Sequence, residues 1–147
     1  MSIYSAYKTN ADLERNGAWL GYKDCRIRLA RLGGANKQAL RVFQARMKPH
    51  QRAIATETME DEEGKKIMID FLANHLVKGW KSVNEDGDFV DGIDNPDGSG
   101  VLLPVTPANV TATFSNPDLE ELLVEVWKDV MKADWYRESL REVTAKN

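Results

Sequence analysis

The spacing of apolar residues changes at Gly33-Gly34, and this change restricts the folds that the chain can adopt. Before the two glycines, in residues 25–32, apolar and polar side chains alternate, which is typical of a strand with one buried face. After them, from Asn36 onward, the apolar positions follow helical spacing. These positions are Ala39, Leu40, Phe43 and Met47. A strand followed directly by an amphipathic helix predicts a fold that combines both elements.

A second short β-like stretch, Gly17 to Leu20, lies just upstream of the alternating segment Cys25 to Leu32. The polar connection between them, Gly21 to Asp24, contains a glycine, and such connections favour a hairpin. We therefore expect an N-terminal β-hairpin whose second strand has one buried face. Cys25 would lie on that face.

The rest of the chain indicates about four to five helices. The first begins at Asn36, a favourable capping residue, and Pro49 breaks or kinks it. A second helix is expected to begin near Thr58, and its apolar stripe continues to Trp80. This stripe consists of Ile67, Met68, Phe71, Leu72, Leu76 and Trp80. With the hairpin, these segments predict a mainly α-helical α+β fold.

Two further helices should begin where a capping residue is followed by proline, at Thr106-Pro107 and at Asn116-Pro117. The last helix has the most regular pattern, and its apolar face requires a partner surface. That face consists of Leu119, Leu122, Leu123, Val126, Trp127, Val130 and Met131. The pattern leaves open whether residues 135–143 continue this helix.

A chain of 147 residues has the usual size of one domain, so residues 1–147 are interpreted as a single domain. Within it, Ser82 to Gly100 contains six acidic residues, four glycines and no basic residue. We interpret residues at about 82–101 as a flexible acidic insert. The glycines there do not fall at the position that an EF-hand calcium loop requires, so no metal site is expected.

Charge is distributed unevenly along the chain. Residues 1–56 hold 11 Lys and Arg against 3 Asp and Glu, whereas residues 57–147 hold 9 against 20. The basic half suits nucleic acid or an acidic protein. Aromatic residues are not interleaved among its arginines, as single-strand platforms require, so nucleic acid is disfavoured. Contact with protein is preferred, including self-association of copies head to tail.

The sequence contains no recognisable catalytic, cofactor or metal motif. Cys25 is the single cysteine, and its place on the apolar face of a strand predicts a buried, unreactive thiol. His50 and His75 belong to no zinc motif, and Gly33-Gly34 falls far short of a phosphate-binding fingerprint. We therefore expect a protein that is not an enzyme and that needs no cofactor.

Two groups of residues are candidates for partner binding. Arg26, Arg28 and Arg31 form the first group: alternation places Arg26 and Arg28 on the open face of the strand, and Arg31 follows in the same basic stretch. Trp135, Tyr136 and Arg137 form the second, because tryptophan, tyrosine and arginine are enriched at binding hot spots.

The order of these segments resembles the tail assembly chaperones of long-tailed, siphovirus-like bacteriophages. The resemblance depends on an ordered series of pieces rather than on one strict signature. The pieces are Leu13-Glu14-Arg15-Asn16-Gly17-Ala18-Trp19-Leu20, Arg26 to Arg31, Gly33 to Lys37, the region of Pro49 and Arg52-Ala53-Ile54, Gly79-Trp80, Leu103 to Val110, Asn116 to Leu119, and Tyr136-Arg137.

The resemblance implies a non-enzymatic protein made late in infection, in the host cell cytoplasm. Such a chaperone keeps the helix-prone tape measure protein soluble and recruits tail tube subunits onto it. No apolar run is long enough for a membrane span, and residues 1–10 carry no export signal, so no membrane is expected. The alternatives are a minor tail or connector protein retained in the virion, and a nucleic-acid-binding regulator.

Chaperones of this kind are often made in two lengths by a −1 ribosomal frameshift. The residues Ala145-Lys146-Asn147 can be encoded by a slippery run of nucleotides. We therefore hypothesise a frameshift at this position.

Overall fold

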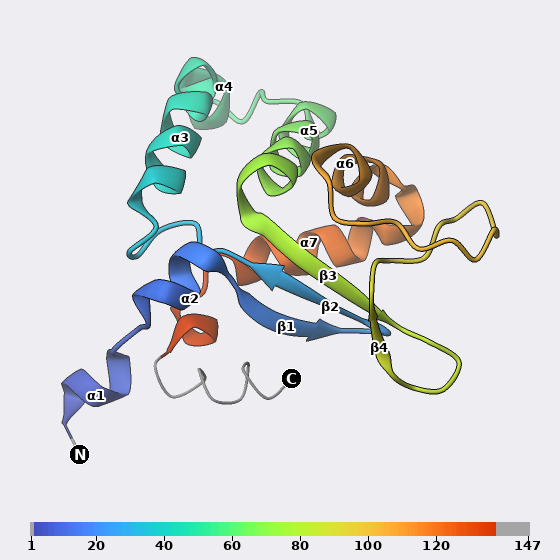
Figure 1. Ribbon diagram of the computed structural model, residues 1–147. Coiled ribbons are helices and arrows are strands. Elements are labelled where there is room, and N and C mark those ends of the chain that lie inside the picture. The colour runs from blue at the N-terminus through green and yellow to red at the C-terminus, as the bar shows by residue number, and fades with distance from the viewer. Residues whose placement is uncertain (1, 138–147) are drawn as a thin grey trace.

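The computed structural model describes residues 2–137, which fold around one antiparallel sheet of four strands in the order β1-β2-β3-β4. Helix α7 lies across one face of this sheet, and α6 and α5 pack beside it towards the start of β3 (Figure 1). The strands are β1 (Ala18–Tyr22), β2 (Cys25–Leu29), β3 (Val77–Val83) and β4 (Phe89–Asp91). The α-helices are α1 (Ile3–Tyr7), α2 (Ala11–Asn16), α3 (Lys37–Met47), α4 (Gln51–Ala55), α5 (Asp61–Phe71), α6 (Pro107–Ser115) and α7 (Glu120–Asp129).

The main core lies between the sheet and the helices. From the sheet, Ile27, Leu29 and Trp80 contribute buried side chains, and from α6 and α7 Phe114 and Val126 meet them. The predicted class, an α+β fold that is mainly helical with an N-terminal hairpin, is therefore confirmed. Reading residues 1–147 as a single domain stays a prediction.

The hairpin is tighter than the sequence indicates. Strand β1 extends to Tyr22, which pairs with Cys25, so the connection is only Lys23-Asp24. Asp24 has a φ of 59°, a left-handed conformation that aspartate tolerates because its short polar side chain suits turns. Strand β2 ends at Leu29, short of the predicted Leu32.

The helix predicted to begin near Thr58 is present, but its predicted continuation to Trp80 is wrong. Helix α5 begins at Asp61 with Glu60 at the N-cap, and it ends at Phe71. A π-helical turn, η2 (Leu72–Leu76), then leads into β3, where Trp80 pairs with Ile27 of β2. Side chains four residues apart lie on one face both in a helix and in a strand. The apolar stripe that includes Leu76 and Trp80 therefore did not reveal the change from helix to strand.

Two of the predicted helix caps form in the structure, and the third does not. The Thr106 side chain accepts a hydrogen bond from the Asn109 backbone N–H at 3.1 Å, which starts α6 as predicted. Asn116 caps the short η3 (Pro117–Leu119) that leads into α7. Asn36 stands at the N-cap of α3, but its side chain forms no cap hydrogen bond. It donates instead to the carbonyl of Arg31.

The acidic segment contains structure that its composition conceals. Strand β4 lies within it and pairs with β3, and Ile93 is buried and bridges to Leu103. Near the other end of the chain, a short helix η4 (Ala133–Tyr136) follows α7 as a separate element. Residues 138–143 of the segment that the sequence left open, and the frameshift site Ala145-Lys146-Asn147, lie outside the described residues.

No helix within residues 2–137 is both long enough and apolar enough to cross a membrane. The N-terminal helices α1 and α2 were not predicted from sequence. The available signal for α2 was Asn10, whose side chain accepts a hydrogen bond from the Leu13 backbone N–H at 3.0 Å.

The predicted burial of Cys25 is confirmed, because its side chain is only 7% exposed. Loss of hydration on burial raises the pKa of the thiol to about 11, with smaller contributions from the nearby Asp24 and Asp94 carboxylates. Compared with the ordinary value of 9.0, this leaves an about 100-fold smaller thiolate fraction at neutral pH.

We therefore expect Cys25 to react with a disulfide reagent at pH 8 about 100-fold more slowly in the folded protein than in the urea-unfolded chain. The neutral thiol is the form that the fold favours, so stability is complete below pH 9 and declines as the pH rises from 9 towards 11. Equal reaction rates in the folded and unfolded chains would contradict this expectation.

Candidate partner-binding surfaces

Arg26 and Arg28 point to the face of the sheet opposite the helices, because Cys25, Ile27 and Leu29 of the same strand are buried. Strand pairing places aromatic and basic neighbours beside them. These five residues, Trp19, Arg26, Arg28, Lys81 and Phe89, are called the outer sheet face.

The outer sheet face combines cations with aromatic rings. The Arg26 guanidinium lies 3.8 Å from the centre of the Phe89 ring, and the Lys81 ammonium lies 5.1 Å from the centre of the Trp19 ring. The sequence showed no aromatic residues among the arginines because these rings arrive from β1 and β4. Cross-strand neighbours are distant in sequence, so linear spacing does not reveal them.

Arg31 does not join the other two arginines. Its guanidinium forms an ion pair of 2.5 Å with Glu14 of α2, and the two side chains are 19% and 3% exposed. Glu14 also accepts a hydrogen bond from the Thr9 hydroxyl at 2.9 Å. This pair connects the N-terminal helices to the end of β2, so Arg31 has a structural contact that the sequence did not indicate.

The second predicted group is divided by the fold. Tyr136 is completely buried, and its hydroxyl donates to the Leu29 carbonyl at 3.2 Å, so its ring belongs to the interior. Trp135 is 36% exposed and donates through its indole N–H to Asp129. Arg137 donates to the Tyr7 carbonyl at 2.7 Å. Burial raises the pKa of Tyr136, as expected for a phenol removed from water.

An apolar groove of about 510 Å³ lies among α3, α4, α5 and α7, and part of its lining, such as Met47, Met68 and Trp127, belongs to the apolar stripes that the sequence indicated. We call it the methionine groove. Its apolar lining includes Met47, Ile54, Met59, Met68, Val124 and Trp127. Ile54 and Val124 are 45% and 43% exposed, so part of this lining faces solvent.

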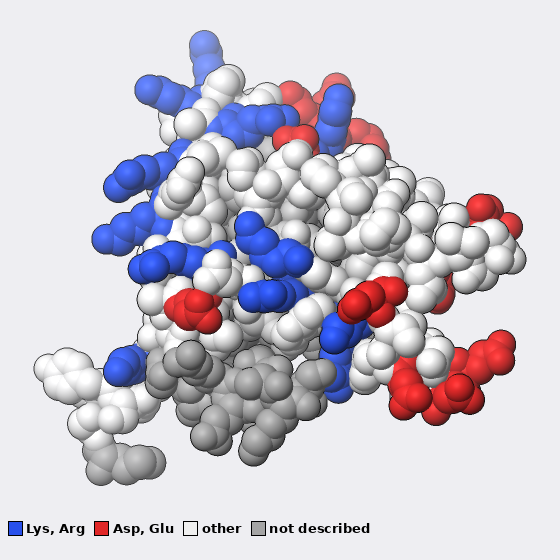
Figure 2. Space-filling view, in the orientation of Figure 1, with Lys and Arg blue, Asp and Glu red and all other residues white. Residues whose placement is uncertain are grey.

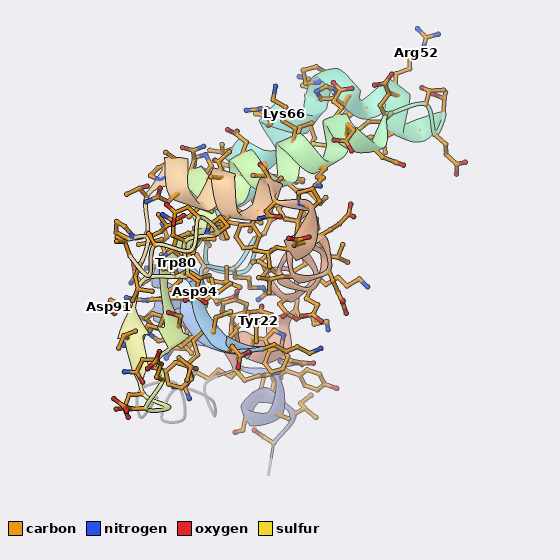
Figure 3. The ribbon with its side chains drawn as sticks, turned by 90° about the vertical axis from the view of Figure 1, so that its right-hand side faces the viewer. Tyr22, Arg52, Lys66, Trp80, Asp91 and Asp94 are labelled. Atoms are coloured by element: carbon orange, nitrogen blue, oxygen red, sulfur yellow. The ribbon has the colours of Figure 1, made fainter. Side chains whose placement is uncertain are left out.

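The methionine groove has a rigid wall and a charged rim. Phe43 packs against Phe71 and Trp127, with ring centres 5.2 Å and 5.6 Å apart. On the rim lie Asp61, Glu62, Lys65 and Glu120, and the Lys65 ammonium lies 3.8 Å from a Glu120 carboxylate oxygen. Figure 3 shows α3, α4 and α5 side by side beyond the sheet, with Arg52 at their far end.

The uneven charge of the sequence is also uneven in space. Figure 2 shows Lys and Arg gathered over α3 and α4, whereas Asp and Glu gather at the opposite side, over the β3 to β4 turn and the loop after β4. Within that turn Glu85, Asp86 and Asp88 are all exposed. Opposite poles of this kind suit contact between copies or with a client of mixed charge.

A family model described as YdaY prophage protein matches residues 35–147. The chain belongs to the YdaY prophage protein family. Its bacteriophage origin, predicted from the sequence, is therefore confirmed. The YdaY match begins just before α3 and includes every residue of the methionine groove, but it excludes β1 and β2. No curated protein and no solved structure matches the chain significantly.

Proposed function

We propose that this YdaY family protein is a non-enzymatic chaperone of phage tail assembly, acting in the host cell cytoplasm. It binds the tape measure protein and helps recruit tail tube subunits onto it. The observation that carries the proposal is the methionine groove, an open apolar surface bounded by helices and contained within the family match.

The shape and lining of the groove suit a helical client. Amphipathic helices bind in apolar grooves by presenting residues at helical spacing, and a long tape measure helix offers many such stripes. Methionine side chains are flexible and polarisable, so one groove can accept successive stripes of different shape. Met47, Met59 and Met68 supply this adaptability, beside the more rigid Trp127.

The charged rim gives the client a preferred sequence. Asp61, Glu62 and Glu120 are acidic, and Lys65 is the basic residue among the groove lining of the described chain. A client stripe flanked by Lys or Arg would meet these carboxylates at the edge of the apolar contact. Charges at the rim of an interface influence the association rate and the choice of partner more than the final affinity.

Val124→Lys is expected to weaken binding of the tape measure protein at least about tenfold, because a charged side chain in the groove must be desolvated when the client docks. The lysine would stand four residues after Glu120 in α7, a spacing that supports a helix. Met131→Lys is the matched control, since Met131 is 49% exposed, follows α7 and does not line the groove. Co-expression with the tape measure protein, pull-down and measurement of client solubility test this expectation.

Three outcomes would contradict the proposal. If the native chain neither binds the client nor raises its solubility, and mass spectrometry finds the chain in purified particles, it is a retained tail or connector protein. Salt-dependent binding of single-stranded DNA, without client binding, would indicate a regulator that uses the outer sheet face. Equal binding by Val124→Lys and Met131→Lys would remove the methionine groove as the client site.

A further inference from the structure

Helix α1 is an apolar segment that the other described residues leave largely exposed. Its side chains Ile3, Tyr4 and Tyr7 are 70%, 80% and 70% exposed, and none of its residues is buried. A helix of five residues is too short to be stable in water without tertiary contacts. We call residues 2–8 the arm, and its exposed apolar side chains indicate a docking surface.

The base of the arm is attached to the body, whereas its tip, Ile3 and Tyr4, makes no burying contact with residues 8–137. Arg137 donates to the Tyr7 carbonyl at 2.7 Å, and its guanidinium lies 5.2 Å from the centre of the Tyr7 ring. The first turn of α1 is closed locally, by the Ser5 N–H donating to the Ser2 hydroxyl at 3.2 Å. The fold therefore fixes the direction of the arm and presents Ile3 and Tyr4 outward.

The arm and the methionine groove lie at opposite ends of the molecule. In Figure 1 and in Figure 3, α1 projects at one end, and α3, α4 and α5 form the other. A chain with its arm fixed at Tyr7 cannot insert the arm into its own groove. The groove that the arm can enter therefore belongs to a second copy.

The two surfaces are complementary in charge as well as in polarity. The arm contains no acidic residue, and Lys8 is its single charged side chain. The groove rim carries Asp61, Glu62 and Glu120 beside the basic Lys65, on the side of α5 and α7 and away from the lysines and arginines over α3 and α4. A lysine beside an apolar contact can approach these three carboxylates. Tyrosine suits such a site, since its ring can bury apolar area while its hydroxyl reaches a polar rim.

We propose that the arm of one copy docks in the methionine groove of a second copy, so that copies join head to tail. The contact is heterologous, because each copy offers an arm at one end and a groove at the other. It rests on the proposed function in one respect, namely that a bound client displaces the arm. The arm then regulates the groove by covering its apolar lining until a client is present.

Complementation between two variants of the full-length chain tests the proposal. Ile3→Ser/Tyr4→Ser removes the apolar tip of the arm, and these side chains are exposed, so the fold is retained. Val124→Lys places a charge in the groove, with Met131→Lys as its control. Sedimentation equilibrium is expected to show at least about tenfold weaker self-association for the arm variant and for the groove variant, but not for the control.

An equimolar mixture of the arm variant and the groove variant is expected to form dimers and nothing larger. One copy then supplies the intact arm and the other the intact groove. A symmetric contact between two arms would leave Val124→Lys associating normally, and a symmetric contact between two grooves would leave Ile3→Ser/Tyr4→Ser associating normally. Either result, or a native chain that stays monomeric at its highest soluble concentration, would overturn the proposal.

Client binding separates this inference from the proposed function. The arm variant retains an intact groove, so it is expected to bind the tape measure protein at least as tightly as the native chain does. If complementation succeeds and the client is not bound, the arm contact stands and the chaperone function fails. If the client is bound and complementation fails, the chaperone function stands and the arm contact is wrong.

Discussion

Replacing Trp80 with alanine is expected to lower the free energy of unfolding by about 3–5 kcal/mol. Trp80 is 3% exposed in the centre of β3, opposite Ile27, so its removal leaves a cavity between the sheet and its covering layer. The substitution also removes a hydrogen bond, because the indole N–H donates to the Leu103 carbonyl at 2.9 Å. That carbonyl belongs to the segment that follows the acidic loop.

Urea unfolding followed by circular dichroism measures this loss. Trp80→Phe keeps an aromatic ring and is expected to cost less than half as much as Trp80→Ala. Trp135→Phe is the control at a partly exposed tryptophan, and it loses the indole hydrogen bond to Asp129, so a change within about 1 kcal/mol is expected there. A loss below about 1 kcal/mol for Trp80→Ala would show that Trp80 does not fill the interior of the sheet layer.

Local patterns in the sequence predicted the hairpin of β1 and β2. The neighbouring strand β3 was missed because its apolar residues also fit helical spacing. Alternation in β2 and the short connection after β1 are properties of adjacent residues, so the sequence displays them directly. Strand β3 depends on pairing with β2, and Leu76 and Trp80 fit a helical stripe as well as a strand face. Strand β4 was missed because acidic residues and glycines surround it, and its pairing with β3 is not a local property.

The candidate surfaces also divide into features that adjacent residues display and features that depend on tertiary contacts. Alternation in one strand was sufficient to place Arg26 and Arg28 on a shared face. The partners of Arg31 and Tyr136 could not be predicted, since Glu14 and the Leu29 carbonyl reach them through tertiary folding. The methionine groove is assembled from four helices, each of which shows only a short apolar stripe. A surface made in this way has no signature in linear spacing.

The second large effect is expected at Glu14, where substitution by alanine should lower the free energy of unfolding by about 3 kcal/mol. Removing one member of a buried ion pair leaves the other charge without compensation, at a cost of about 3–5 kcal/mol. The lower end of this energy range applies because the Arg31 side chain is 19% exposed, so water can reach part of its guanidinium. The site is tightly packed, since a Cβ on Gly34 would overlap a Glu14 carboxylate oxygen.

A double-mutant cycle with Arg31→Met separates the ion pair from simple loss of packing. Once Arg31 is replaced, Glu14→Ala no longer leaves an uncompensated guanidinium, so the double variant should be more stable than Glu14→Ala alone. Urea unfolding of the four proteins gives the coupling energy, expected to be at least about 1 kcal/mol. Additive losses would mean that solvent screens the pair, and that hydrogen bonds such as the one from Asn10 N–H to the Tyr136 carbonyl hold the base of the arm instead.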